Sequence, residues 1–259
     1  MKIDLHNHTK LCNHATGSVD EYVEAAIERG VSIYGFSDHA PMDYDLEYRM
    51  SFDQMDLYEK LVLEAAIKYG DKITVLLGYE VDYLAGYMDD RVLKRPCDYL
   101  IGSVHFVDEW GFDNPAFIHQ YGAIDMDVLY TDYFNLVENM AKTGYFDIVG
   151  HLDLLKVFGF FPKKDIRLLA KNALIAIKKA NMTIELNVSG WRKPVKEAYP
   201  SLSLLEIIAE LEIPITFGSD AHRPDQVGMF SDEIEALAKS VGYTHCATYR
   251  NRDRELIKF

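Results

Sequence analysis

The sequence has no hydrophobic run long enough to cross a membrane. A spanning helix needs about 18 or more apolar residues in succession, and no stretch of this 259-residue chain approaches that length. The first residues, MKIDLHNH, also lack the apolar core of a secretory signal. We therefore expect a cytoplasmic protein without a membrane partner.

Cysteine is scarce as well. The three cysteines, Cys12, Cys97 and Cys246, are far apart and form no CxxC pair. An odd, scattered set argues against a disulfide framework and indicates reduced thiols. Cys12 lies two residues before His14 and could act as a stray soft metal ligand, although a buried free thiol is the commoner role for such a residue.

Basic charge is the third feature in short supply. The chain has 27 lysines and arginines against 41 aspartates and glutamates, which gives a net charge of −14. Proteins that bind nucleic acid through its phosphates need a basic stripe, and none is present. The acidity argues against a nucleic-acid partner and suits metal cations or a cationic small substrate.

The chain also lacks linkers and low-complexity tracts, so we expect one domain over residues 1–259. Short apolar runs alternate with helical patterns. The expected strands are 2–6, 32–37, 73–79, 99–104, 146–150, 183–188 and 214–219, and the expected helices are 19–30, 55–70, 126–143, 167–180, 202–212 and 232–242. This alternation predicts an α/β fold, a TIM-like barrel of seven βα units, one fewer than the usual eight. An open doubly wound sheet is the alternative.

Polar residues that can bind metals follow six of these seven strands. The carboxyl ends of barrel strands meet on one face, where active sites lie. A single histidine there is usually structural, but nine such residues together predict a polynuclear metal site. They are His6, His8, His14, His39, Glu80, His105, His151, Asp220 and His222. His119 and His245 lie outside strand ends and are expected to be ordinary residues.

The ligand types limit the choice of metal. Imidazole and carboxylate without thiolate suit Zn, Mn or Fe, and the sequence does not choose between them. Nine ligands suit two or three divalent ions. Glu80 could bridge two of them, an arrangement that serves phosphoryl transfer.

The ordered motifs resemble those of the PHP (polymerase and histidinol phosphatase) family of metal-dependent phosphoesterases over essentially the full length. SVHFVDEWGFDNP, FDIVGHLDLLK and ELNVSGWR are most similar to stand-alone histidinol-phosphatases. The resemblance implies a distorted seven-stranded barrel holding three metals, with the active site at the carboxyl ends of the strands. It assigns one ion to His6, His8, Glu80 and Asp220, a second to Glu80, His105 and His151, and a third to His14, His39 and His222.

The expected reaction is hydrolysis of L-histidinol phosphate in histidine biosynthesis, by attack of a metal-bridging hydroxide on phosphorus. The expected catalytic residues are Glu80 and Asp220, as metal ligands, and Asp38. Asp38 lies next to His39 and either delivers a proton or, as is commoner for such a carboxylate, orients a histidine.

Substrate contacts are expected from two groups of residues. Arg192 is the first candidate for gripping phosphate, and Lys156 and Arg223 are further candidates that suit surface or loop roles equally well. Glu109 and Asp113 are expected to face the cationic part of the substrate. Trp110, with Phe112, offers a stacking surface or simply pins its loop.

Three other functions stay open. The first is a PHP-family phosphatase or phosphodiesterase that acts on nucleotides or other small phosphates. The second is an amidohydrolase-type deaminase, although no strand end carries the lysine that often bridges metals in such enzymes. The third is a metal-binding module without catalytic activity.

Overall fold

The computed structural model describes residues 1–259 and contains one seven-stranded parallel sheet. The strand order is β1-β2-β3-β4-β7-β8-β9, so each strand of this sheet pairs with the strand of the sheet that comes before or after it in the chain. The strands are β1 (Ile3–Asp4), β2 (Ile33–Phe36), β3 (Thr74–Asp82), β4 (Tyr99–Ser103), β7 (Ile148–Val149), β8 (Thr183–Asn187) and β9 (Ile215–Gly218). All seven expected strands are present.

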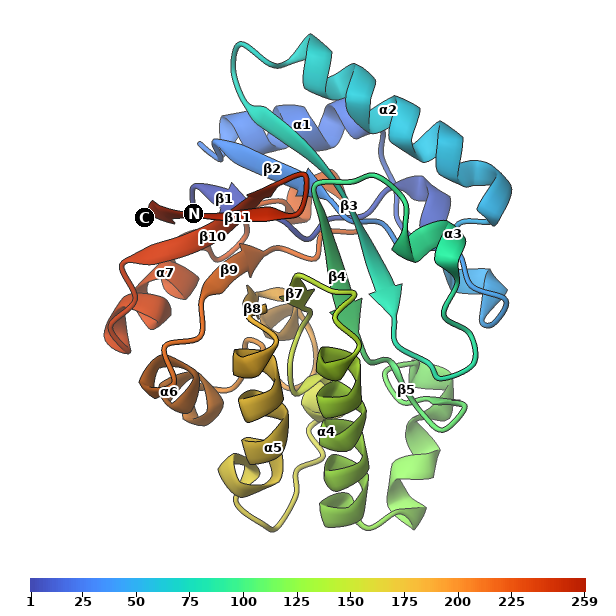
Figure 1. Cartoon of the computed structure of the whole chain (residues 1–259), viewed down its shortest axis with the longest axis vertical. Helices are drawn as coiled ribbons and strands as arrows, with labels where there is room; N and C mark the ends of the chain where they lie inside the picture. The colour runs from blue at the N-terminus through green and yellow to red at the C-terminus, as the bar shows by residue number, and fades with distance from the viewer.

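The first and last strands meet and bring the sheet close to a complete barrel (Figure 1). The backbone N–H of Leu5 donates to the carbonyl of Phe217 at 2.9 Å, and that of Asp220 donates to the carbonyl of His6 at 2.7 Å. The predicted TIM-like (βα)7 barrel is therefore confirmed, and the open sheet is not formed.

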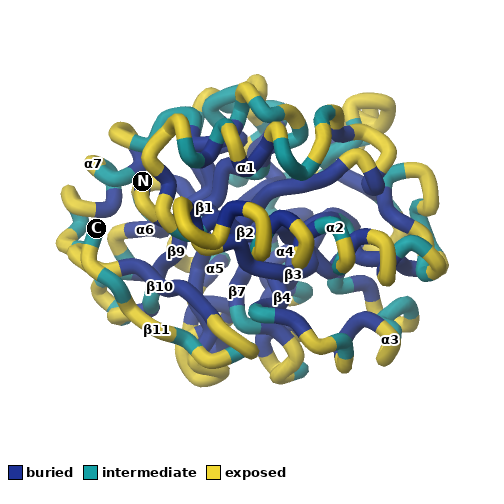
Figure 2. Tube along the Cα trace, turned by 90° about the horizontal axis from the view of Figure 1, so that it is seen from above, coloured by how far each residue is buried: buried dark blue, intermediate teal, exposed yellow.

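Helices surround the barrel and leave their outer faces exposed, while the strands inside are buried (Figure 2). α1 begins at a capping box in which Ser18 and Glu21 satisfy each other's backbone N–H groups. The α-helices are α1 (Val19–Glu28), α2 (Met55–Lys68), α3 (Asp90–Leu93), α4 (Met126–Lys142), α5 (Ile166–Lys179), α6 (Leu202–Glu210) and α7 (Ser231–Ser240). None of them is both long and apolar enough to cross a membrane.

Short 3₁₀ helices lie mostly in the loops at the carboxyl ends of the strands. They are η1 (Lys10–Cys12), η2 (Leu46–Tyr48), η3 (Phe52–Gln54), η4 (Pro115–Ala123), η5 (Leu154–Phe158), η6 (Ser189–Arg192) and η7 (Pro224–Gln226). In a 3₁₀ helix, side chains three residues apart share one face, which matters for the site described below.

Two hairpins were not expected from the sequence. β5 (Phe106–Val107) and β6 (Trp110–Gly111) form one, and β10 (His245–Arg250) and β11 (Asp253–Lys258) form the other. The second hairpin covers the amino end of the barrel. The N–H of Arg252 donates to the carbonyl of Asp98, just before β4, at 2.8 Å, and the hydroxyl of Thr216 at the start of β9 donates to Ala247 at 2.9 Å.

Tyr99 fills the barrel interior beneath the site. Its hydroxyl donates to the carbonyl of Leu5 at 2.7 Å, and its ring lies against Gly35 and Gly78. A Cβ at Gly78 would lie 2.5 Å from the ring, closer than atoms can approach. The two glycines therefore make room for one large residue that joins three strands.

We expect Gly78→Ala to destabilise the protein by about 1–3 kcal/mol, because an added methyl group in a packed interior forces its neighbours to move. Urea denaturation measures the change. Gly122→Ala is the matched control, since a Cβ there meets nothing within 4 Å, and its effect should stay within about 0.5 kcal/mol. Equal unfolding midpoints for the two variants would contradict this account of the interior.

Candidate metal centre

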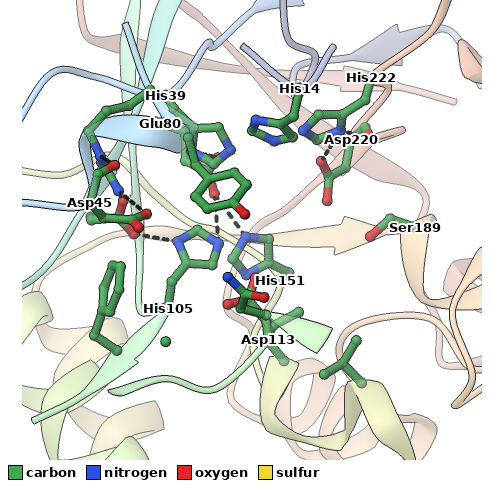
Figure 3. Close-up of a pocket in the computed structure, with 18 of the residues that line it drawn as sticks. His14, His39, Asp45, Glu80, His105, Asp113, His151, Ser189, Asp220 and His222 are labelled. Atoms are coloured by element: carbon green, nitrogen blue, oxygen red, sulfur yellow. Dashed lines mark hydrogen bonds and ion pairs between the residues drawn. The ribbon is translucent and has the colours of Figure 1, made fainter. Parts of the chain in front are cut away.

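All nine predicted metal ligands come together at the carboxyl end of the barrel. Figure 3 labels those that line the cavity, which are His14, His39, Glu80, His105, His151, Asp220 and His222. Eight of the nine ligands follow a strand end, and Glu80 lies inside β3, two residues before its end. The loops after β1, β2, β4, β7 and β9 supply the others. Residues up to 216 positions apart in sequence thus converge because parallel strands end at the same edge.

Glu80 lies at the middle of this arrangement. Its side chain is 1% exposed and its oxygens lie 2.8–3.7 Å from nitrogens of His6, His8, His39, His105 and His151. Oε2 faces the first three rings and Oε1 faces the last two. One carboxylate therefore presents its two oxygens to two separate sets of imidazoles, as a bridging ligand would.

Asp220 adds another carboxylate to the centre. Its Oδ1 lies 3.2 Å from Nε2 of His8 and 3.4 Å from Nδ1 of His222. The backbone of Asp220 has a φ of 50°, in the left-handed region that few residues other than glycine adopt. This turn directs both Asp220 and His222 toward the centre.

Several ring nitrogens at the centre lack hydrogen-bond partners. They are Nε2 of His6, both nitrogens of His8, Nδ1 of His39, Nδ1 of His151 and Nε2 of His222, all buried. Buried polar atoms without partners are rare and need an explanation such as a bound ion. Ligand atoms within 4.8 Å of one another form the groups His6–His8–Glu80, Glu80–His105–His151 and His14–His39–His222. These residues fit divalent cations, in groups that parallel the sets implied by the family resemblance.

Charges at the centre compensate one another. Burial alone would raise the pKa of Glu80, but the surrounding imidazoles hold that pKa well below its ordinary value. Burial would lower the pKa of His105, yet the carboxylates of Asp82 and Glu80 raise it to about 10. The pKa values of His6 and His8 are raised as well, so protons on these three rings balance the buried carboxylates when no ion is bound, whereas burial lowers the pKa values of His39 and His222. Divalent cations would displace those protons on binding.

Two carboxylates that were not predicted from the sequence contact ring nitrogens of the predicted ligands. Oε1 of Glu185 lies 2.7 Å from Nδ1 of His6, and its Oε2 accepts the backbone N–H of His151 at 2.7 Å. Asp82 likewise pairs with Nδ1 of His105. A carboxylate on one ring nitrogen orients the ring and leaves the other nitrogen free to bind a metal.

The sequence carried a signal for both residues. Glu185 interrupts the apolar strand β8, and a charged residue in a buried strand is seldom without a partner. Asp82 lies two residues after Glu80 on β3, and this spacing puts both side chains on the same face of the strand. The patterns suggest buried charges but do not say which histidine each one meets.

Asp38 supports His8 rather than facing substrate. Its side chain is fully buried, its Oδ1 lies 3.4 Å from Nδ1 of His8, and it accepts the N–H of His39 at 2.9 Å. The hydroxyl of Thr9 donates to its other oxygen. These contacts correspond to the orienting role, and Asp38 is not among the residues that line the cavity.

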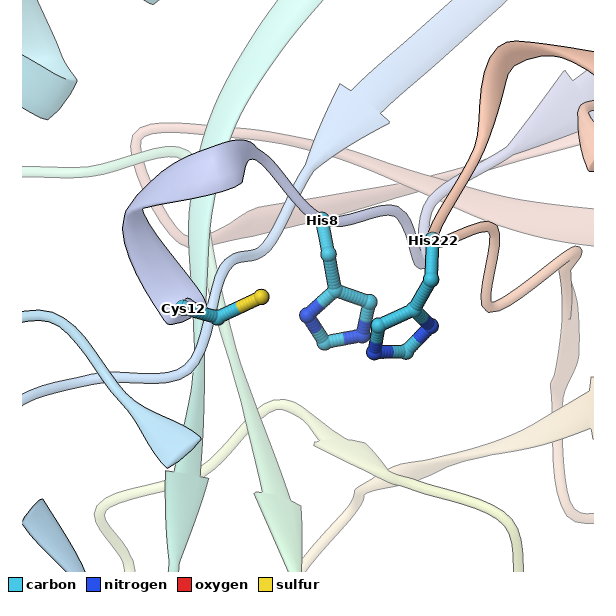
Figure 4. A group of neighbouring side chains, drawn as sticks. All are labelled: His8, Cys12 and His222. Atoms are coloured by element: carbon cyan, nitrogen blue, oxygen red, sulfur yellow. The ribbon is translucent and has the colours of Figure 1, made fainter. Parts of the chain in front are cut away.

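Cys12 lies beside the centre (Figure 4). Its sulfur is close to ring nitrogens of His8 and His222. The thiol donates to the carbonyl of Thr9 at 3.1 Å, and burial, together with the charge of Asp38, raises the pKa of Cys12 far above its ordinary value. Because only the thiolate binds metals well, these contacts favour the role of a buried free thiol.

The centre opens into a cavity of about 730 Å³. Of the predicted substrate contacts, Glu109, Asp113 and Arg192 line it, and Asp45 and Lys193 add further charges. Figure 3 shows Asp113 below the His105–His151 pair and Ser189 on the side of Asp220. The cavity therefore offers both acidic and basic groups next to the metal ligands.

Arg192 is held with one nitrogen free. Its Nη2 donates to the carbonyls of Ser219 at 2.7 Å and Asp220 at 2.9 Å, whereas Nη1 is buried without a partner. Ser189 starts the same 3₁₀ turn, η6, and also lines the cavity. Side chains at i and i+3 of such a turn overlie each other, so the hydroxyl and the guanidinium lie on one side of the turn.

Lys156 and Arg223 do not line the cavity, which corrects the expectation that they contact substrate. The Lys156 ammonium is 1% exposed and lies 2.8 Å from Glu197, 2.8 Å from the carbonyl of Ala198 and 3.2 Å from Asp153. It anchors its own loop, because a buried ammonium must be paired. Arg223 lies on the surface, 2.9 Å from Asp225.

Trp110 and Phe112 pin the loop that carries them. Phe112 is fully buried, and the ring of Trp110 packs edge-on against Tyr121 with centroids 4.9 Å apart. Neither residue lines the cavity. The expected stacking surface for substrate is therefore absent from its wall, and the structural role that the sequence left open is the one observed.

Comparisons with known proteins agree with this geometry. The PHP domain model matches residues 4–189. The chain is 40% identical over 255 residues to the "Probable histidinol-phosphatase" of Deinococcus radiodurans, with 96% of each chain covered. It is 27% identical over 256 residues to the histidinol-phosphatase of Bacillus subtilis, covering 88% of this chain and 96% of that one.

One solved structure extends the likeness in fold. The histidinol phosphate phosphatase of Lactococcus lactis subsp. lactis, complexed with zinc, L-histidinol and phosphate, matches with a TM-score of 0.79. The match covers 98% of each chain at 19% identity. At that identity it supports the barrel fold alone.

We expect Glu185→Gln to weaken metal binding about 10- to 100-fold, because the neutral amide orients His6 less firmly than the carboxylate does. Competition between the protein and a chelator for Zn²⁺ measures the affinity. Glu80→Gln, which changes a predicted ligand itself, should show the largest loss of affinity. Glu206→Gln, at an exposed position on α6, is the control and should bind like the wild type. Unchanged affinity in Glu185→Gln would show that this carboxylate does not support the centre.

Proposed function

The chain belongs to the PHP domain family, and on that basis we propose that it hydrolyses L-histidinol phosphate to L-histidinol and phosphate as a metal-dependent phosphomonoesterase. The observation that carries the proposal is the buried Glu80 carboxylate shared between two sets of imidazoles, at the wall of a cavity that contains charges of both signs. The full-length likeness to proteins named as histidinol-phosphatases supports the choice of substrate.

We propose that the centre holds two to three divalent ions, of Zn, Mn or Fe. The ligands would be His6, His8, Glu80 and Asp220 for one ion, Glu80, His105 and His151 for another, and His14, His39 and His222 for the third. When bound, such ions supply positive charge for phosphoryl oxygens and lower the pKa of water to near neutrality. Glu80 and Asp220 act as catalytic residues through this role.

The phosphate group would be bound at η6. Arg192 has a buried N–H at Nη1 that no protein atom accepts, and Ser189 offers a hydroxyl on the same side of the turn. The two carbonyl contacts of Nη2 hold the guanidinium in place, so little conformational entropy is lost when Nη1 donates to a phosphate oxygen. Charge that develops on that oxygen during transfer is stabilised by this fixed donor.

The amine and imidazole of the substrate would face the acidic part of the cavity. Glu109 and Asp113 line that part, and the hydroxyl of Tyr87 donates to Glu109 at 3.3 Å. A substrate with an anionic phosphate at one end and a cationic body at the other matches a cavity with a basic turn and separate carboxylates. Electrostatic matching of this kind contributes mainly to specificity.

Phosphate release from L-histidinol phosphate, AMP and an aryl phosphate, with metal content measured on the same sample, tests the proposed function. We expect a strong preference for histidinol phosphate and two or three ions per chain. Equal or faster turnover of the other esters would refute the substrate while leaving the phosphatase chemistry. Metal-loaded protein that is inert toward all three esters would favour the module without catalytic activity, and release of ammonia from amine substrates would favour a deaminase.

Two variants separate phosphate recognition from recognition of the cationic body. Arg192→Ala should weaken inhibition by inorganic phosphate about 10- to 100-fold, since a hydrogen bond to a charged group contributes about 1.5–3 kcal/mol. Asp113→Asn should raise KM for histidinol phosphate and leave KM for the aryl phosphate unchanged. Metal content of both variants is the control. Unchanged phosphate inhibition in Arg192→Ala would remove Arg192 from the site.

A further inference from the structure

We propose that Arg49 is a positioning residue of the metal centre, which holds His105 through Asp82 and the segment after His39 through the carbonyl of Ala40. Arg49 touches none of the nine predicted ligands. The inference rests on the proposed metal centre but not on the proposed substrate. It predicts that the affinity for some of the bound ions depends on Arg49 and that the affinity for the others does not.

Arg49 is a buried cation with a complete set of partners. Its side chain is 3% exposed, and its Nη1 donates to Oδ2 of Asp82 at 2.8 Å and to the carbonyl of Ala40 at 3.3 Å. On the outer side, Nη2 donates to the carboxylate of Asp45 at 3.2 Å and Nε to its carbonyl at 3.0 Å. Burying a guanidinium is costly unless it is paired, so these contacts fix its position.

The first contact of Arg49 acts on the ion set Glu80–His105–His151. The two oxygens of Asp82 have different partners. Oδ2 accepts from Arg49, and the other oxygen pairs with Nδ1 of His105. The guanidinium therefore sets the plane of the carboxylate, and the carboxylate sets the plane of the ring. Nε2 of His105 is then directed toward Glu80, 3.7 Å from its Oε1.

The second contact acts on the ion set His14–His39–His222. Ala40 directly follows His39, and its N–H donates to the backbone carbonyl of Glu80 at 2.8 Å, while its own carbonyl accepts from Arg49. Arg49 thus ties the segment that carries His39 to strand β3. Without it, this segment keeps one fewer link to the strand that carries Glu80.

Two other ligands, His6 and His8, lie against carboxylates that Arg49 does not touch. His6 pairs with Glu185 at 2.7 Å, and Nδ1 of His8 lies 3.4 Å from Asp38, which accepts from Thr9. Loss of Arg49 should therefore weaken the ions at His105 and His39 and spare the ion at His6 and His8. This selectivity separates a positioning role from a general effect on folding.

The test is a chelator competition that resolves the individual ions, combined with the visible spectrum of the Co²⁺-substituted protein. Arg49→Met should lower the affinity for part of the bound ions by about 10-fold or more, retain one tightly bound ion per chain and change the Co²⁺ spectrum. Asp82→Asn should weaken only the ion at His105. Arg49→Lys should restore part of the affinity, since it keeps a cation beside Asp82.

Arg91→Met is the matched control. Arg91 is an exposed arginine that pairs with Asp89 and stacks on Phe52, away from the centre, so this variant should bind all ions like the wild type. Wild-type affinity for every ion in both Arg49→Met and Asp82→Asn would overturn the inference, and so would an equal loss of all ions. If Arg49→Met does not fold, Asp82→Asn decides alone. No substrate enters this test, so failure to hydrolyse histidinol phosphate would refute the proposed function without touching this inference.

Discussion

The centre depends on one buried carboxylate, Glu80, surrounded by five imidazoles. A negative charge inside a barrel is tolerated only if positive charge lies close on several sides. Protons on His6, His8 and His105, whose pKa values are raised, supply that charge when no ion is bound, and divalent cations would supply it when bound. The other buried carboxylates at the centre also need positive charge nearby, so this end of the barrel is suited to cations before any substrate binds.

The barrel makes this concentration of charge possible. Tyr99 and the glycines beside it close the interior below the site, and the β10–β11 hairpin covers the opposite end. The predicted metal ligands are thus gathered at one end, and the strands beneath them are buried. A carboxylate placed lower in the barrel would have no partners and would cost several kcal/mol.

Rigidity of the centre comes from residues that do not touch the proposed ions. Glu185, Asp38 and Asp82 each hold one histidine, and Arg49 in turn holds Asp82. Since a ligand displaced by a fraction of an ångström binds more weakly, supports of this kind are as much a part of the site as the ligands. On the cavity side, the carbonyl contacts of Arg192 play the same part for η6, the proposed phosphate-binding turn.

The sequence by itself determined the parallel strands and the group of nine candidate ligands at their carboxyl ends, and it left a barrel and an open sheet as alternatives. From seven apolar runs alternating with helices the sequence predicts strands that end on one face, whereas the meeting of His6 with His222 requires closure of the barrel, which joins the first strand to the last. The sequence did not determine the roles of Lys156, Trp110 or Asp82. Lysine in a loop suits a surface, a phosphate contact or a buried pair equally well, and only the fold brings Glu197 and Asp153 to Lys156. Which carboxylate meets which ring, and which cation is left free to bind substrate, depend on distances between loops that are far apart in the chain, and tertiary packing alone decided them.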